Sequence, residues 1–446
     1  MTANRTKGGL DRALSLFTDV KAGEGATALL LAFNIFSVLA CYYVLKTVRE
    51  SLILTEGGAE VKSYTAAGQA LLLVAFVPAY GWLASRVSRV RLINGVTLFF
   101  ASHLVIFYVL GAAGVHIGVA FFLWLGIFSL VVPAQVWAFA NDLYDSERGK
   151  RLFPLVGLGM SLGAWVGSTA ASALFAGLGP YRLLLVSAAG IALCPLLTVW
   201  IERREEGRTR AAGAAASVAP VGKAGGFQLV LSQRYLLLIA LLVMVLNVVN
   251  TVGEFILGKL VVEHTATAVA AGTAGGLDQA ALIGTFYGDF YSWVNLVGFL
   301  FQLLLVSKIF KYIGVRGALF ILPVVALFSY GMLAFLPVLA IVRVAKIVEN
   351  STDYSIQNTA RQALFLPTSR EAKYKAKQAI DSFFWRAGDL LQAVIVFVGA
   401  SLAFGIRGFA AINLILVAVW FALVVGIVRE HRKMTPIDTT ETAAAA

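Results

Sequence analysis

The feature that most constrains the fold is a succession of apolar segments, each about 20 residues long, separated by short polar connections. A helix of that length crosses the hydrocarbon core of a bilayer. By this length criterion we predict about twelve membrane-spanning helices. Their predicted ranges are 26–48, 63–84, 91–112, 116–140, 152–178, 181–201, 235–258, 281–306, 315–336, 337–362, 378–404 and 407–428.

The composition agrees with this reading. Hydrophobic residues make up 59% of the 446 positions and charged residues only 13%, whereas soluble domains carry about 25% charged residues. We therefore predict an all-α integral membrane protein and exclude a soluble globular one. Cys41 and Cys194 lie in apolar runs and the four histidines have no ligand spacing, so we expect no disulfide, metal or cofactor.

Basic residues crowd every second connection between the predicted spans. Because positively charged loops stay cytoplasmic, this alternation predicts a multi-pass protein of the cell membrane with both termini inside. Topology and contact with anionic membrane lipid account for the net charge of +12, so nucleic acid is not expected as a partner. The residues concerned include Arg86, Arg89, Arg91, Arg148, Lys150, Arg151, Arg203, Arg204, Lys308, Lys311, Arg316, Arg370, Lys373, Lys375 and Lys377.

A long connection rich in Ala, Gly and charge divides the spans into two groups of six. Two six-helix halves joined by a cytoplasmic linker are typical of the major-facilitator architecture, whose halves surround a cavity at the membrane midplane. The predicted parts are a lead-in (1–25), a first bundle (26–201), the linker (202–234), a second bundle (235–428) and a tail (429–446).

Gly159, Gly163 and Gly167 recur at intervals of four within the fifth predicted span. Such spacing places small residues on one helix face and predicts close packing against a second helix. A dinucleotide-binding loop would need a preceding strand, which the sequence does not indicate.

Charged residues interrupt the first predicted span near its end. Lys46, Arg49 and Glu50 share one helix face, so a local ion pair is available to them. Two interpretations remain open. Either the long side chains extend to the membrane interface, or they form a cationic group for an anionic substrate.

The tenth span carries the most polar face. Its polar positions recur every three or four residues, while the other face is aliphatic. Either water or substrate meets this face, or the residues form a structural network in which Lys346 pairs with Asn350. The positions are Arg343, Lys346, Glu349, Asn350, Asp353 and Gln357.

Two further spans hold isolated polar groups. Asn247, Asn250 and Glu254 form a stripe on the seventh span, and Asp289 is a lone acid among aromatic residues on the eighth. Polar groups at membrane depth face protein or water, so these residues are candidates for a cavity or for interhelical hydrogen bonds.

Four blocks of the chain, in order, resemble the nucleotide transporter family, the ATP/ADP translocases of plastids and intracellular bacteria. Three of them are the segment KTVRESLILTEGGAEVKSY, which comes first, the triplet Gly288, Asp289 and Phe290, which comes third, and the segment 354–381, which comes last. The second block is the most specific and comprises Trp137, Phe139, Ala140, Asn141, Lys150, Arg151, Phe153, Pro154, Leu155, Gly157, Leu158 and Gly159.

The resemblance implies a secondary transporter of the bacterial inner membrane that exchanges ATP for ADP, or takes up nucleotides, by alternating access. It implies no enzymatic activity, and no phosphate-binding Gly-x-x-x-x-Gly-Lys-Ser/Thr run occurs. The substrate-binding candidates are Lys46, Arg49, Asn250, Glu254, Asp289, Arg343, Lys346, Asp353 and Arg386, and the candidates for stacking on a base are Tyr43, Tyr287, Tyr291 and Trp385.

The chain departs from the family pattern at three places. Asn250 stands where the family has an acid, Asp389 lies near the position of an expected lysine, and apolar residues near Leu125 replace an acid of the fourth span. Two alternatives therefore stay open. One is a proton-coupled transporter of another organic anion that uses Asp289, Asp353 or Asp389, and the other is a membrane sensor or scaffold that transports nothing.

Overall fold

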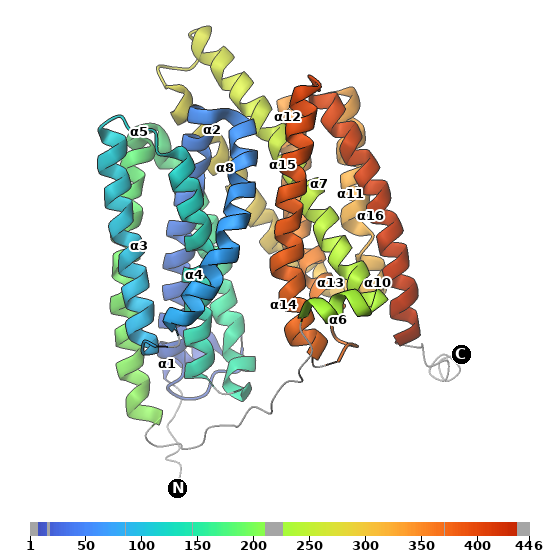
Figure 1. The fold of residues 1–446 in the computed structure, drawn as a ribbon. Helices are drawn as coiled ribbons and strands as arrows, with labels where there is room; N and C mark the ends of the chain where they lie inside the picture. Colours follow the sequence, from blue (N-terminus) through green and yellow to red (C-terminus); the bar gives the residue numbers. More distant parts are fainter. Residues whose placement is uncertain are drawn as a thin grey trace. The chain divides into compact units, whose positions relative to one another are not determined.

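The computed structural model describes residues 8–15, 18–84, 86–144, 146–209, 226–369 and 371–434. Within these ranges all regular structure is helical (Figure 1). The first seven residues of the predicted lead-in, residues 210–225 of the linker and residues 435–446 of the tail lie outside the described part.

The helices follow one another along the chain with short connections. Their bounds are α1 Gly9–Leu14, α2 Gly25–Ala84, α3 Arg89–Ala112, α4 Gly118–Leu143, α5 Ser146–Thr209, α6 Gly226–Ser232, α7 Arg234–Ala270, α8 Gln279–Leu304, α9 Val306–Tyr312, α10 Gly314–Ala318, α11 Ile321–Phe335, α12 Leu339–Thr352, α13 Asn358–Ala363, α14 Lys377–Ala379, α15 Trp385–Ser401 and α16 Ile406–Met434. Three π-helical segments lie between them, η1 Asp353–Gln357, η2 Ala372–Ala376 and η3 Ile380–Phe384.

In the described ranges, eight helices are long and apolar enough to cross a membrane, and the pair α8 and α9, bent by 44°, adds a ninth. Two of the eight each contain two spans, because α2 breaks at Gly58 (φ 73°) and α5 breaks at Gly179 (φ 68°). Glycine adopts positive φ at no steric cost, so each break is a tight turn between two rods. With α12 and α13 as one further, more polar span, the prediction of an all-α membrane protein of about twelve spans is confirmed.

The first predicted span was too short. We expected it to end at residue 48, but the helix continues to the break at Gly58. Arg49 and Glu50 therefore lie within the first rod of α2 and not at its end. This correction makes simple extension of their side chains to the membrane interface a poorer explanation of these charges.

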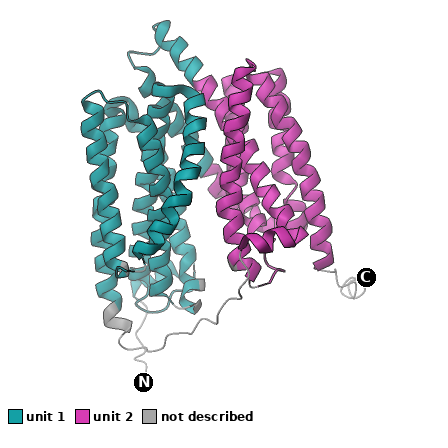
Figure 2. Cartoon of the chain, viewed as in Figure 1, with its two compact units in different colours: residues 1–217, 262–295 teal, residues 218–261, 296–446 magenta. Residues whose placement is uncertain are grey.

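The chain forms two compact units, shown in separate colours in Figure 2. Unit 1 comprises Met1–Ser217 and Val262–Asn295, and unit 2 comprises Val218–Val261 and Leu296–Ala446. Helices α7 and α8 each contribute residues to both units. The division into bundles at residues 201 and 235 stays a prediction.

In unit 1, α2 and α5 pack with their backbones in contact at the predicted glycines. A methyl group on Gly159, Gly163 or Gly167 would overlap a carbonyl oxygen of α2, which belongs to Ala32, Phe36 and Ala40 respectively. The contacted residues repeat every four positions, as the glycines do. The prediction of close helix packing is thus confirmed.

We expect Gly163→Ala to lower the free energy of unfolding by about 1–3 kcal/mol, because the new methyl group meets main-chain atoms that cannot rotate away. Gly157→Ala is the matched control in the same helix, since a methyl group there has no neighbour within 4 Å. The control should leave stability unchanged or raise it by up to about 1 kcal/mol. Equal melting temperatures for the two variants would contradict the packing account.

Candidate functional site

In unit 1, the two rods of α2, before and after Gly58, carry a compact charged cluster. The side chain of Glu50 is fully buried and forms ion pairs with Arg49 and, at 2.6 Å, with Lys62. The Arg49 and Lys62 side chains are 16% and 13% exposed. We had predicted the Glu50 ion pair from its neighbours on the same helix, and the structure assigns it to Arg49 and to Lys62 beyond the Gly58 turn.

Tyrosine rings complete this cluster. The Lys46 ammonium lies 4.1 Å from the ring centroid of Tyr291 and 5.2 Å from that of Tyr43, and Lys62 lies 5.5 Å from the ring of Tyr287. The Tyr291 hydroxyl donates a hydrogen bond of 3.3 Å to Glu50. The structure thus brings together five predicted site residues, which are Tyr43, Lys46, Arg49, Tyr287 and Tyr291.

This cluster gathers three cations, Lys46, Arg49 and Lys62, and the buried Glu50 carboxylate pairs with two of them. Attraction to an anion is stronger at low dielectric than in water. Arginine and lysine pair with phosphate or carboxylate oxygens, so the arrangement suits a multiply charged anion. Tyr287 and Tyr291 are buried and already face Lys62 and Lys46, so their stacking on a base stays a prediction.

Unit 2 holds a second, more enclosed cluster. Lys346 is 2% exposed, and its ammonium donates to Glu349 at 3.1 Å and to the Asn250 side chain at 2.7 Å. Glu254 lies 3.8 Å from the same ammonium and accepts a hydrogen bond of 2.9 Å from Asn350. The structure assigns Asn350 to Glu254, so the predicted pairing of Lys346 with Asn350 was wrong.

Tyr330 on α11 closes this cluster, and the sequence analysis missed it. Its hydroxyl lies 3.0 Å from a Glu349 carboxylate oxygen. A methyl group on Gly253 would overlap that hydroxyl, so the glycine makes room for it. One ammonium and the two carboxylates Glu254 and Glu349 leave one negative charge in excess. We had weighed a face open to water against a structural network, and here the Lys346 side chain is held by protein groups.

A third group in unit 2 joins α7 and α15. Asp389 is paired with Arg386 at 3.2 Å and accepts a hydrogen bond of 2.8 Å from Asn247. Asn247 also donates to the main-chain oxygen of Trp385, whose ring lies 5.1 Å from the Arg361 guanidinium. The predicted phosphate ligand Arg386 therefore has a carboxylate partner of its own, and Trp385 faces a cation.

Three predicted residues remain to be placed. Asp289 is half-buried on the part of α8 that belongs to unit 1, and Arg343 is half-buried one turn before Lys346. Asp353 is buried at the start of the π-helical segment η1, and neither its Oδ1 atom nor the Gln357 amide has a hydrogen-bond partner among the described residues. Unpartnered buried polar atoms at a π-helical segment mark a place where water or a ligand is needed.

Comparison with solved structures shows the fold. The nucleoside transporter NupG is similar with a TM-score of 0.63 and 11% identity, over 92% of this chain and 100% of NupG. A bacterial homologue of the iron transporter ferroportin (TM-score 0.61, 13% identity) covers 90% of this chain and 98% of its own. A bacterial homologue of the human lysosomal transporter Spinster (0.58, 14%) covers 92% and 98%. The predicted major-facilitator-like fold is confirmed.

No protein-family profile and no curated protein sequence matches the chain. At 11–14% identity, the structural similarity carries the fold alone. The resemblance to the nucleotide transporter family stays a prediction that rests on the four sequence blocks.

Proposed function

We propose that this protein is a secondary transporter of nucleotides that works by alternating access and exchanges or takes up ATP and ADP. One observation carries the proposal: the unit 1 cluster, which brings Lys46, Arg49 and Lys62 together around the buried Glu50, with tyrosine rings beside Lys46 and Lys62. The fold, which it shares with solved transporters, and the four family blocks support it.

The competing interpretation of these charges was extension to the membrane interface. It is disfavoured because Arg49 and Lys62 are at most 16% exposed and both reach inward to the buried Glu50. Glu50 then has a definite role. It holds the two cations in position and offsets part of their charge. The oxygens of a bound polyphosphate would then pair with the same cations. We assign Lys46, whose ammonium lies over the rings of Tyr43 and Tyr291, to the incoming phosphate.

The chemistry of recognition is tested by thermal shift of the purified full-length chain with ATP, ADP, adenosine and pyrophosphate. A ligand that binds the folded state raises the melting temperature. We expect ATP and ADP to stabilise most, pyrophosphate less and adenosine least, because phosphate charge supplies most of the attraction. Adenosine equal to ATP would contradict the assignment of the cationic cluster. A flat result for all four would favour the sensor or scaffold.

A second candidate function, proton-coupled transport of another organic anion, is favoured by the unit 2 cluster. Its Glu254, Glu349 and Lys346 carry one negative charge in excess, which a single proton would neutralise. The predicted acid Asp389 is a weaker candidate because Arg386 balances its charge, whereas the single ammonium of Lys346 faces two carboxylates. An imposed pH gradient should then accelerate uptake, and Glu349→Gln should abolish that acceleration. Uptake that ignores the gradient would remove this candidate.

A further inference from the structure

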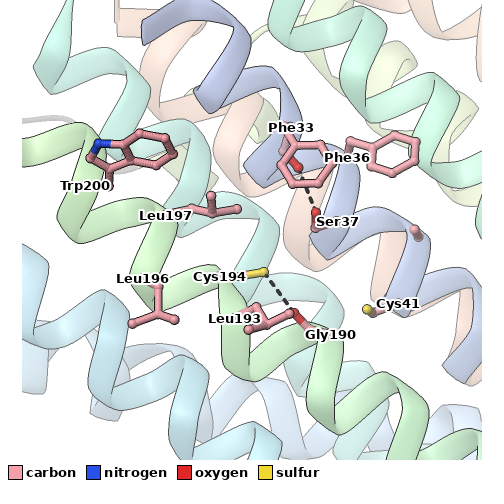
Figure 3. A pocket seen from close by; sticks show the side chains of 11 residues that line it. Phe33, Phe36, Ser37, Cys41, Gly190, Leu193, Cys194, Leu196, Leu197 and Trp200 are labelled. Atoms are coloured by element: carbon pink, nitrogen blue, oxygen red, sulfur yellow. Dashed lines mark hydrogen bonds between the residues drawn. The ribbon is translucent and has the colours of Figure 1, made fainter. Parts of the chain in front are cut away.

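Unit 1 has an apolar groove on its surface, and none of the residues that line it belongs to the charged cluster. It has a volume of about 440 Å³ and runs between the first rod of α2 and the second rod of α5 (Figure 3). Phe33, Phe36 and Ser37 line one side, and Leu193, Leu196, Leu197 and Trp200 line the other. Phe33, Leu196 and Trp200 are each more than half exposed, so the groove opens outward.

Apart from the indole N–H of Trp200 at the Arg203 end, the groove is apolar, and the polar groups of Ser37 and Cys194 are bonded within their own helices. The Ser37 hydroxyl donates to the main-chain oxygen of Phe33 at 2.9 Å, and the Cys194 thiol donates to that of Gly190 at 3.5 Å. Both dashed lines in Figure 3 are these internal bonds. A polar occupant would find few partners along this groove, whereas a hydrocarbon chain needs none.

On α5, two arginines follow the last residue that lines the groove, Trp200. Leu193, Leu197, Trp200 and Arg204 recur every three or four residues, so they form one helix stripe, and Arg203 flanks it. Arg203 and Arg204 are exposed, and neither forms an ion pair within the described part of the chain. From Leu193 to Arg204 the stripe is about 16 Å long. Apolar residues, an indole and then two positive charges follow the order of acyl chain, interface and headgroup in a bilayer leaflet.

We propose that this groove is a binding site for an anionic phospholipid, with one acyl chain between α2 and α5 and the phosphate on Arg203 and Arg204. The two arginines commit the site to a negatively charged headgroup, since basic side chains at the membrane surface attract anionic lipids. Two acidic neighbours, Glu202 and Glu205, are already engaged within the chain. Glu205 is buried and bound by Thr27 and Arg148, and Glu202 also has an interaction partner of its own. The site is separate from the proposed nucleotide cluster and stands or falls independently of it.

The test is native mass spectrometry of the purified chain titrated with phosphatidylglycerol or phosphatidylcholine of identical acyl chains. The wild type should retain phosphatidylglycerol preferentially. Arg203→Gln/Arg204→Gln should weaken its retention by roughly tenfold or more and remove the preference. Ser37→Leu should also lower retention because it fills the groove without changing any charge.

Lys308→Gln/Lys311→Gln is the matched control, since it removes two exposed positive charges from unit 2. It should leave most of the preference in place. Equal retention of the two lipids by the wild type, or equal losses in the arginine variant and the lysine control, would overturn the proposal. Melting temperatures of all variants exclude misfolding as the cause of a loss, and Ser37→Leu decides the matter if the arginine variant does not fold.

Discussion

Replacing Lys346 by methionine is expected to lower the free energy of unfolding by about 3–5 kcal/mol, one of the largest effects available in this chain. The substitution removes the ammonium between Glu349 and the Asn250 side chain. Glu349 is 3% exposed, so its carboxylate would be left buried without a compensating charge. The measurement is a denaturant or thermal unfolding curve in detergent.

The double variant Lys346→Met/Glu349→Gln separates charge from shape. It removes the unpaired carboxylate as well, so we expect it to recover a substantial part of the lost stability. Lys373→Met is the surface control and should change stability by less than about 0.5 kcal/mol, because Lys373 is exposed. Equal losses in the single and double variants would show that the charge balance of the cluster is not what holds it together.

Lys46→Ala is expected to weaken nucleotide binding by roughly 10- to 100-fold, the range for one lost hydrogen bond to a charged group. Stability should change little, since the Lys46 ammonium rests on the faces of Tyr43 and Tyr291 and the buried Glu50 is paired by two other cations. Titration calorimetry with ATP and ADP measures the effect.

Two controls accompany this variant. Lys46→Arg keeps the positive charge and should retain most of the affinity, and Lys373→Ala removes an exposed lysine far along the chain and should retain all of it. If Lys46→Ala and Lys373→Ala weakened binding equally, the effect would be one of overall charge and the assignment of Lys46 to the site would be wrong.

The sequence predicted those features that depend on local spacing. The glycine repeat at Gly159, Gly163 and Gly167 implied a close helix contact, and the structure shows one against Ala32, Phe36 and Ala40. The helix face with Lys46 and Arg49 offered a cationic group as one of two interpretations, and both residues lie in the unit 1 cluster. Periodicity is sufficient for such predictions because it fixes which residues share a face.

Periodicity within one helix cannot predict contacts between separate helical rods. Lys62 reaches Glu50 only because α2 folds back at Gly58, and the Gly57–Gly58 pair was the available signal for that turn. Tyr330 meets Glu349 across two helices, and nothing in its own apolar segment distinguishes it. Spacing also could not tell that Lys346 would be enclosed, since burial depends on how neighbouring helices pack.

The most direct test of the central claim is transport by the purified chain in proteoliposomes. Labelled ATP and ADP are supplied outside, with or without unlabelled nucleotide inside, and Lys46→Ala serves as the impaired reference. The proposal predicts saturable uptake that is competed by unlabelled ATP and strongly reduced in Lys46→Ala, with internal nucleotide accelerating uptake if the protein exchanges. The absence of saturable uptake of any nucleotide, in vesicles where the chain is folded and correctly inserted, would contradict it.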